Sequence, residues 1–183
     1  ISFRGMSRIK GEADLRLGDN RLNARGGYGT PGERLELDLA APALAQFGSG
    51  FGGALNAHAT LAGSTSKPEI AFEMKGSRLV MPGEHHLDSL SAGGSLHGEA
   101  LNFTVEAAGY QKTAEVLLQK AGFSVRGSLA QHDVNIKAKL ANDAALNLQA
   151  SGGLTDPAQG WRNVQWRGVL SELTATGRVP FRL

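Results

Sequence analysis

Apolar and polar residues alternate along most of the chain with a period of two. The alternation is clearest at residues 35–39, 55–61 and 70–74, where every second side chain is apolar. This period is typical of a β-strand with one apolar face and one solvated face. Tracts rich in glycine, serine and proline at residues 48–53 and 63–68 separate these segments. The pattern therefore predicts consecutive strands joined by turns.

The same pattern predicts strands toward both ends of the chain. A hairpin turn is expected at Gly18-Asp19-Asn20, between two alternating runs. Residues 113–121 fit either a strand or a helix, and a strand is favoured because the neighbouring segments are strands. Residues 41–47 predict one short helical turn, with Pro42 at its first position and Gly48 just past its end. The other expected strands are residues 13–17, 22–26, 79–81, 87–92, 101–107, 123–127, 134–140, 146–150, 164–166, 173–175 and 179–183.

The order of these segments favours an antiparallel meander, because turn signals recur about every ten residues and no crossover helix is evident. The sequence predicts an all-β protein whose sheet has one solvated face and one continuously apolar face. The apolar face must lie against a second layer or another apolar partner. A β-sandwich and a β-solenoid therefore stay open as alternative folds. The polar positions expected to face water include Glu36, Asp38, Glu73, Asn102, Glu106, Lys137 and Lys139.

Composition narrows the function classes. The chain has 183 residues without a linker, which indicates one domain, and its 6% of aromatic residues are too few to fill a compact core. The 19 basic and 17 acidic residues are scattered, which argues against a nucleic-acid groove. Cysteine is absent, so no disulfide is expected. Both ends fall inside patterned segments, and we expect the chain to be a piece of a longer protein.

No motif predicts a catalytic or metal centre. The densest group of possible ligands is Glu84-His85-His86-Leu87-Asp88, but adjacent residues of an extended chain point in opposite directions and no third ligand is placed by spacing. We interpret this group as a solvated turn. His58, His97 and His132 are expected at the surface.

Nucleophilic catalysis and phosphate binding also lack their signatures. The sequence has no Gly-x-Ser-x-Gly elbow, and the glycine-rich residues 48–53 lack the lysine and helix of a phosphate loop. We therefore expect no enzyme and no cofactor. Trp161 and Trp166 are expected to seal an apolar core rather than to stack on a ligand.

A succession of short motifs resembles a known family. Gly127-Ser-Leu-Ala-Gln-His132 is followed by alternation at residues 146–150 and by Trp166-Arg-Gly-Val-Leu170. This order is similar to that in the family of TamB, the translocation and assembly module subunit of Gram-negative bacteria, and points to its C-terminal β-taco region. Residues 22–29, 35–45 and 61–70 resemble the same family, so the similarity spans essentially the whole chain. The ending at residues 180–183 departs from the family pattern, which has a tryptophan-containing strand there.

The resemblance implies a fold, a location and partners. The expected fold is an elongated, mostly antiparallel β-sheet curled into a U-shaped trough with an apolar interior, of which residues 1–183 form one fragment. The parent is expected to be periplasmic and anchored in the inner membrane, similar to the AsmA-like and bridge-like lipid transfer proteins. Its implied role is passage of phospholipid toward the outer membrane. Assembly of outer-membrane proteins and autotransporters with the barrel protein TamA is also implied.

The trough interpretation names candidate residues. Small apolar residues such as Ala57 and Ala107 leave room that acyl chains would fill. Two alternatives remain: a chaperone-like binder of nascent outer-membrane protein strands, and a structural solenoid or adhesin stalk. An uncovered apolar face also predicts self-association of the fragment. The candidate groove-lining residues are Leu35, Leu37, Leu39, Leu55, Ala57, Ala59, Leu61, Ile70, Phe72, Met74, Leu101, Phe103, Val105, Val134, Ile136, Ala138, Leu140, Leu146 and Leu148.

Overall fold

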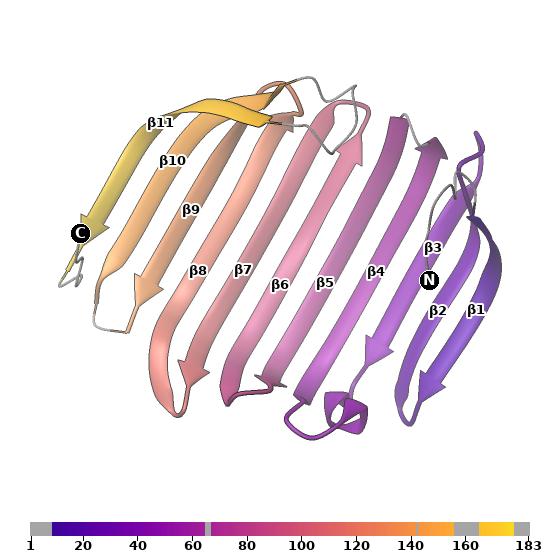
Figure 1. Cartoon of the computed structure of the whole chain (residues 1–183), viewed down its shortest axis with the longest axis horizontal. Coiled ribbons are helices and arrows are strands. Elements are labelled where there is room, and N and C mark those ends of the chain that lie inside the picture. The colour runs from indigo at the N-terminus through magenta and orange to yellow at the C-terminus, as the bar shows by residue number, and fades with distance from the viewer. Residues whose placement is uncertain (1–8, 65–66, 142, 156–164, 178–183) are drawn as a thin grey trace.

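The chain forms one antiparallel β-sheet in which each strand pairs with the next one along the sequence (Figure 1). This computed structural model describes residues 9–64, 67–141, 143–155 and 165–177. Within these residues the sheet has 11 strands in the order β1 to β11, without a crossover. No second sheet covers it in the described part of the chain. The expected all-β meander is confirmed, and the β-sandwich and β-solenoid alternatives are wrong.

Several strands are longer than the sequence pattern predicted. Residues 70–74 and 79–81 belong to one strand, and so do most of residues 113–127, where Thr113 and Ala114 form the preceding turn. The expected strand at residues 179–183 lies outside the described residues. The strands are β1 (Ile9–Leu17), β2 (Asn20–Tyr28), β3 (Arg34–Ala41), β4 (Gly52–Ser64), β5 (Lys67–Met81), β6 (His85–His97), β7 (Ala100–Lys112), β8 (Glu115–Ser128), β9 (His132–Leu140), β10 (Ala145–Thr155) and β11 (Gln165–Thr176).

A line of irregular positions crosses the middle strands, and we call it the crease. Its members interrupt the regular pairing of β4 to β8 at neighbouring places: Gly53, Arg78, Asp88, Gly109 and Gln119. Three of them have left-handed backbone angles, with φ of 86° at Gly53, 47° at Arg78 and 69° at Gly109. A side chain at Gly53 would collide with the Arg78 carbonyl. In β5 the crease lies at Arg78, between residues 70–74 and 79–81, which the sequence pattern predicted as separate strands; in β8 it lies at Gln119, inside the predicted segment 113–121.

The short helix η1 (Leu44–Phe47) confirms the predicted helical turn but begins later than expected. Ala41 still belongs to β3, and Ala43 is the N-cap residue, so the placement of Pro42 at the first helical position is wrong. Asn20, which is only 3% exposed, holds this corner. Its amide nitrogen donates to the Ala43 carbonyl at 2.9 Å, and its amide oxygen accepts from the Ala43 N–H at 3.0 Å.

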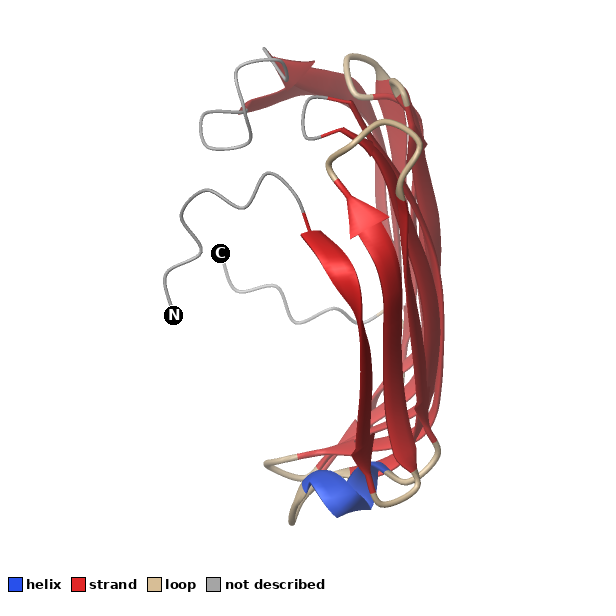
Figure 2. Cartoon of the chain, turned by 90° about the vertical axis from the view of Figure 1, so that its right-hand side faces the viewer, coloured by secondary structure: helices blue, strands red, loops and turns tan. Residues whose placement is uncertain are grey.

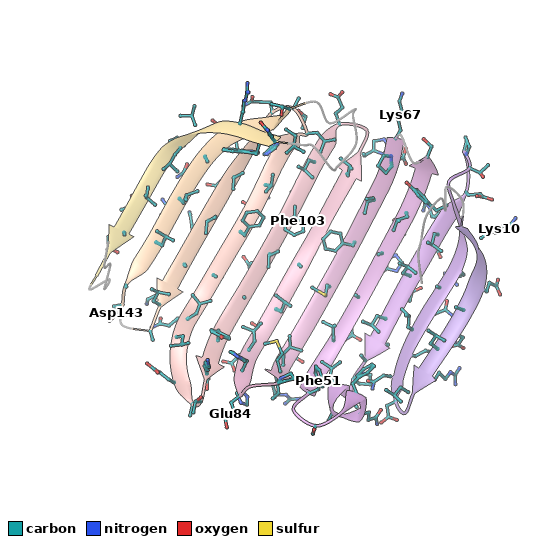
Figure 3. The ribbon with its side chains drawn as sticks, viewed as in Figure 1. Lys10, Phe51, Lys67, Glu84, Phe103 and Asp143 are labelled. Carbon is teal, nitrogen blue, oxygen red and sulfur yellow. The ribbon has the colours of Figure 1, made fainter. Side chains whose placement is uncertain are left out.

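The sheet is curved along its strands, so that one face is concave (Figure 2). Phe103 stands in front of the ribbon on this concave side (Figure 3). We call the face that carries Phe103 and the residues in register with it the inner face, and the opposite one the outer face. Within the described residues, no helix is long and apolar enough to span a membrane.

Candidate functional site

Rows of paired apolar residues cross the inner face from one edge of the sheet to the other. Strand pairing places these residues side by side, and alternation places them on the same face. The row through Ile136 consists of Leu15, Leu22, Leu39, Ala57, Met74, Ala92, Val105, Phe123, Ile136, Leu148 and Leu173. The row through Phe103 consists of Ala13, Ala24, Leu37, Ala59, Phe72, Gly94, Phe103, Val125, Val134, Ala150 and Leu170.

The outer face between these two rows is polar along its whole length. Since the same strands supply both faces, the separation comes from alternation alone. Neither inner row contains a charged residue, and the row between them contains no large apolar residue. Its members are Asp14, Asn23, Asp38, His58, Glu73, Gly93, Thr104, Ser124, Asn135, Gln149 and Glu172.

The strand register brings the candidate groove-lining residues together on the inner face. Most of them belong to the two inner rows or to the flanking rows through Leu35 and Leu55, and Leu140 follows Ala138 by two positions. Whether they hold a ligand stays a prediction. Sequence reasoning omitted other inner-face residues, namely Leu15, Leu22, Ala92, Leu96, Phe123, Val125, Leu170 and Leu173. The alternation at residues 123–125 could have identified Phe123 and Val125 as inner-face residues. Beside Ala92 the glycines Gly93 and Gly94 interrupt the alternation, so the sequence gives no such signal there.

Three phenylalanines lie at the middle of the inner face. The Phe103 ring centroid is 5.7 Å from that of Phe72 and 5.7 Å from that of Phe123. Gly94 lies between Phe72 and Phe103 in register. A Cβ atom there would come within 2.9 Å of the Phe72 ring and 3.0 Å of the Phe103 ring. Because Gly94 has no side chain, the Phe72 and Phe103 rings can occupy the space beside it.

His132 and Trp166 form the main polar contact on the apolar side of β9 to β11. The Trp166 Nε1–H donates to His132 Nε2 at 2.9 Å, and His132 Nδ1 lies 2.8 Å from the Ser128 carbonyl oxygen. His132 is only 6% exposed, so the expectation of a surface histidine is wrong: its ring contacts Trp166, which is 34 positions away in the sequence but only two strands away in the sheet. Trp166 is 43% exposed and does not seal a closed core. Trp161 lies outside the described residues.

Two hollows of about 610 Å³ each lie on opposite faces of β8 to β11. The one on the inner face, which we call the Trp166 pocket, is lined by apolar side chains that include Phe123, Val134, Leu148 and Leu170, with His132 and Trp166 at one end. The one on the outer face, which we call the charged hollow, is bordered by Glu106, Lys120, Lys137, Lys139 and Glu172. The same strands therefore offer an apolar site and a charged site back to back.

His58, His97 and His85 each contact one polar side chain. His58 Nδ1 lies 2.6 Å from an Asp38 carboxylate oxygen, and His97 Nδ1 lies 3.5 Å from Glu69; both rings are exposed, as expected. His85 Nδ1 lies 2.7 Å from the Tyr110 hydroxyl. The interpretation of residues 84–88 as a solvated turn holds only for Glu84, because β6 begins at His85. In the part of the chain that the structure describes, no three histidine or carboxylate groups gather around a common metal position.

Ion pairs of β1 to β3 lie on the outer face. Arg21 donates two hydrogen bonds of 2.9 Å to Asp14, and Arg16 donates a third of 3.3 Å. These hydrogen bonds lower the pKa of Asp14, and the bonds from Arg21 have the largest effect. Arg25 similarly donates to Glu36 at 2.8 Å, which raises the pKa of Arg25. Both pairs are exposed, so they keep this face hydrated and add little stability.

Comparison with known proteins gives one finding. A family model described as "TamB, N-terminal domain" matches residues 9–177. The match lies in the expected family but in its N-terminal domain, so the assignment to the C-terminal β-taco region finds no support. The searches of curated proteins and of solved structures gave no match.

Proposed function

Because this chain belongs to the TamB family, we propose that its inner face carries the acyl chains of phospholipids between the inner and the outer membrane. In this proposal the chain is one segment of a longer periplasmic protein that is anchored in the inner membrane. The family supports a role in transport and assembly in the bacterial envelope, and the proposal needs no catalytic step and no cofactor.

The observation that carries the proposal is the continuity of the two inner rows. They cross all 11 strands without a charged residue, and no second layer of the described chain covers them. An apolar face of this extent is stable in water only when something apolar lies on it. A phospholipid tail meets this need, while its headgroup stays in water at the open side of the curved sheet.

The energetics favour a bound but movable tail. Burial of a methylene group contributes about 0.8 kcal/mol, so a chain of about sixteen carbons gains on the order of 12 kcal/mol before ordering costs are subtracted. This gain depends on area and not on direction. A tail that shifts from one strand to the next along the inner rows exchanges leucine, valine, alanine and phenylalanine contacts for similar ones, so no single position holds it strongly.

The proposal includes a TamA-like outer-membrane barrel as the partner that receives the segment's cargo or acts beside it. A second candidate function is binding of nascent outer-membrane protein strands, whose apolar side chains would lie on the same two inner rows. Photo-crosslinking from Ile136 separates the two functions, because lipid adducts support acyl transport and protein adducts support strand binding.

The sharpest test places a charge on the inner face. Ile136→Asp, and separately Leu37→Asp, are introduced into the full-length protein, and Asn135→Asp serves as the matched control on the outer face of the same strand. A buried carboxylate without a partner costs several kcal/mol, so the inner variants are expected to lose co-purified phospholipid in native mass spectra and to impair outer-membrane integrity. Asn135→Asp is expected to behave like the wild type. Normal lipid content and integrity in both inner variants would sink the proposal.

A further inference from the structure

The Trp166 pocket differs from the rest of the inner face because one aromatic side chain bounds it. A Cβ atom on Gly152 would come within 2.6 Å of Trp166 Cζ2, and one on Gly168 would also collide with the indole. Gly152 and Gly168 are paired in register on β10 and β11. The indole therefore lies over a floor that two facing glycines leave open.

The hydrogen bonds of this corner are complete. The Trp166 N–H only donates and the Ser128 carbonyl only accepts, so the His132 ring that joins them carries its proton on Nδ1 and accepts at Nε2. Both ring nitrogens of His132 are thereby used. The corner has no free side-chain donor or acceptor to offer to a ligand, although it contains two polar residues.

Because these hydrogen-bonding groups are already paired, they indicate which class of ligand the pocket accepts. A peptide strand in the pocket would turn some of its backbone N–H and C=O groups toward apolar side chains that offer them no partner, which is costly. A hydrocarbon chain makes no such demand. The volume of about 610 Å³ lies within the range of about 300 to 1,000 Å³ that is usual for small-ligand sites. The lining around Phe123, Leu148 and Leu170 is apolar and carries no charge.

We propose that the Trp166 pocket is a preferred seat for one fatty acyl chain, with the indole of Trp166 packed against the chain as a clamp. This inference rests on the proposed function and adds a position to it: the tail rests at the β8 to β11 side of the sheet. Trp166 is then a residue that contacts the ligand. The hydrogen bond from Trp166 to His132 holds the indole in place, and the exposed surface of the indole contacts the acyl chain.

The test uses Trp166 as its own reporter. In the variant Trp161→Phe, Trp166 is the sole tryptophan, and its fluorescence is recorded with phosphatidylethanolamine vesicles whose acyl chains carry bromine. Bromine quenches an indole only at contact, so we expect the emission to fall by about half or more with brominated lipid and to stay unchanged with the unbrominated lipid. Unquenched emission from protein that carries lipid in its native mass spectrum overturns the inference and leaves the proposed function intact. Absence of bound lipid overturns both.

A pair of variants tests the clamp itself. Trp166→Ala is expected to weaken binding of a fatty acid, measured by isothermal titration calorimetry, by about tenfold, since a large apolar contact is lost. Val169→Ala is the matched control, because Val169 lies on the same strand, is 68% exposed and belongs to the outer face; it is expected to bind as the wild type does. Trp166→Phe keeps an aromatic ring and should retain most of the affinity if contact with the chain is what matters. Equal affinities of Trp166→Ala and Val169→Ala would overturn the clamp.

Discussion

The Trp166 pocket and the charged hollow are formed by the same strands and have the same volume, but only the charged hollow is bordered by charged side chains. Ile136 and Leu148 face one side, whereas their chain neighbours Lys137 and Asn147 face the other. The inner pocket has its few polar groups fully paired. In the charged hollow, Glu172 accepts hydrogen bonds of 2.7 Å from Asn147 and from Gln149, whereas Lys120 and Glu106 are only loosely paired, at 3.9 Å.

The comparison teaches that side-chain alternation alone assigns chemistry to each face of this sheet. A shift of one residue in register would exchange the two faces completely. Substitutions at neighbouring positions of one strand are therefore matched experiments, because they share the backbone and differ only in the face. The following predictions compare such neighbours.

The largest effect on stability is expected for Phe103→Ala compared with Thr104→Ala. Phe103 contacts Phe72 and Phe123 on the inner face, and its loss leaves a gap between two rings. We expect the free energy of unfolding in urea to fall by about 2 to 4 kcal/mol, toward the lower end of fully buried sites because the face is open. Thr104 donates only a long hydrogen bond of 3.4 Å to the Gly93 carbonyl, and its variant should change stability by less than about 1 kcal/mol. Equal losses would contradict the assignment of the faces.

A smaller effect is expected for Gly94→Ala compared with Gly93→Ala. A methyl group at Gly94 enters the space between Phe72 and Phe103, which forces the rings apart and costs about 1 to 3 kcal/mol. A methyl group at Gly93 meets only the Phe72 carbonyl oxygen, at 3.5 Å. Gly93→Ala should be neutral or stabilise by up to about 1 kcal/mol, because alanine restricts the unfolded chain. Urea titration measures the free energy of unfolding of both variants. A larger loss for Gly93→Ala than for Gly94→Ala would contradict the assignment of the two faces.

The smallest effect is expected for Asp14→Asn on the outer face. The bonds from Arg21 and Arg16 lower the folded-state pKa of Asp14 below its ordinary value of 3.8. A lowered pKa stabilises the folded chain above the ordinary value, and the contribution disappears as the pH falls through the lowered one. The difference in urea midpoint between the wild type and Asp14→Asn should thus be small and constant near neutral pH and vanish in strong acid. Because the pair is exposed, high salt should also reduce it. A difference that grows in acid would contradict the pairing.

Much of this architecture could be predicted from the sequence because a period of two fixes which residues share a face. Alternation alone places residues such as Leu37, Phe72 and Ile136 on one face. Long-range contacts were not predictable in this way. His132 stands between polar neighbours, and its burial depends on Trp166, 34 positions further along the chain. The long span of β5 was missed because Arg78 carries no signal for a left-handed backbone.

The crease has a consequence for how uniform the trough is. Because its irregular positions lie at neighbouring places on adjacent strands, the bend that bulges introduce falls at one level across β4 to β8. Strands that bent at unrelated levels would give a channel that narrows and widens at every step. A shared bending line gives these strands a common cross-section, so a molecule that fits over one of them fits over the next.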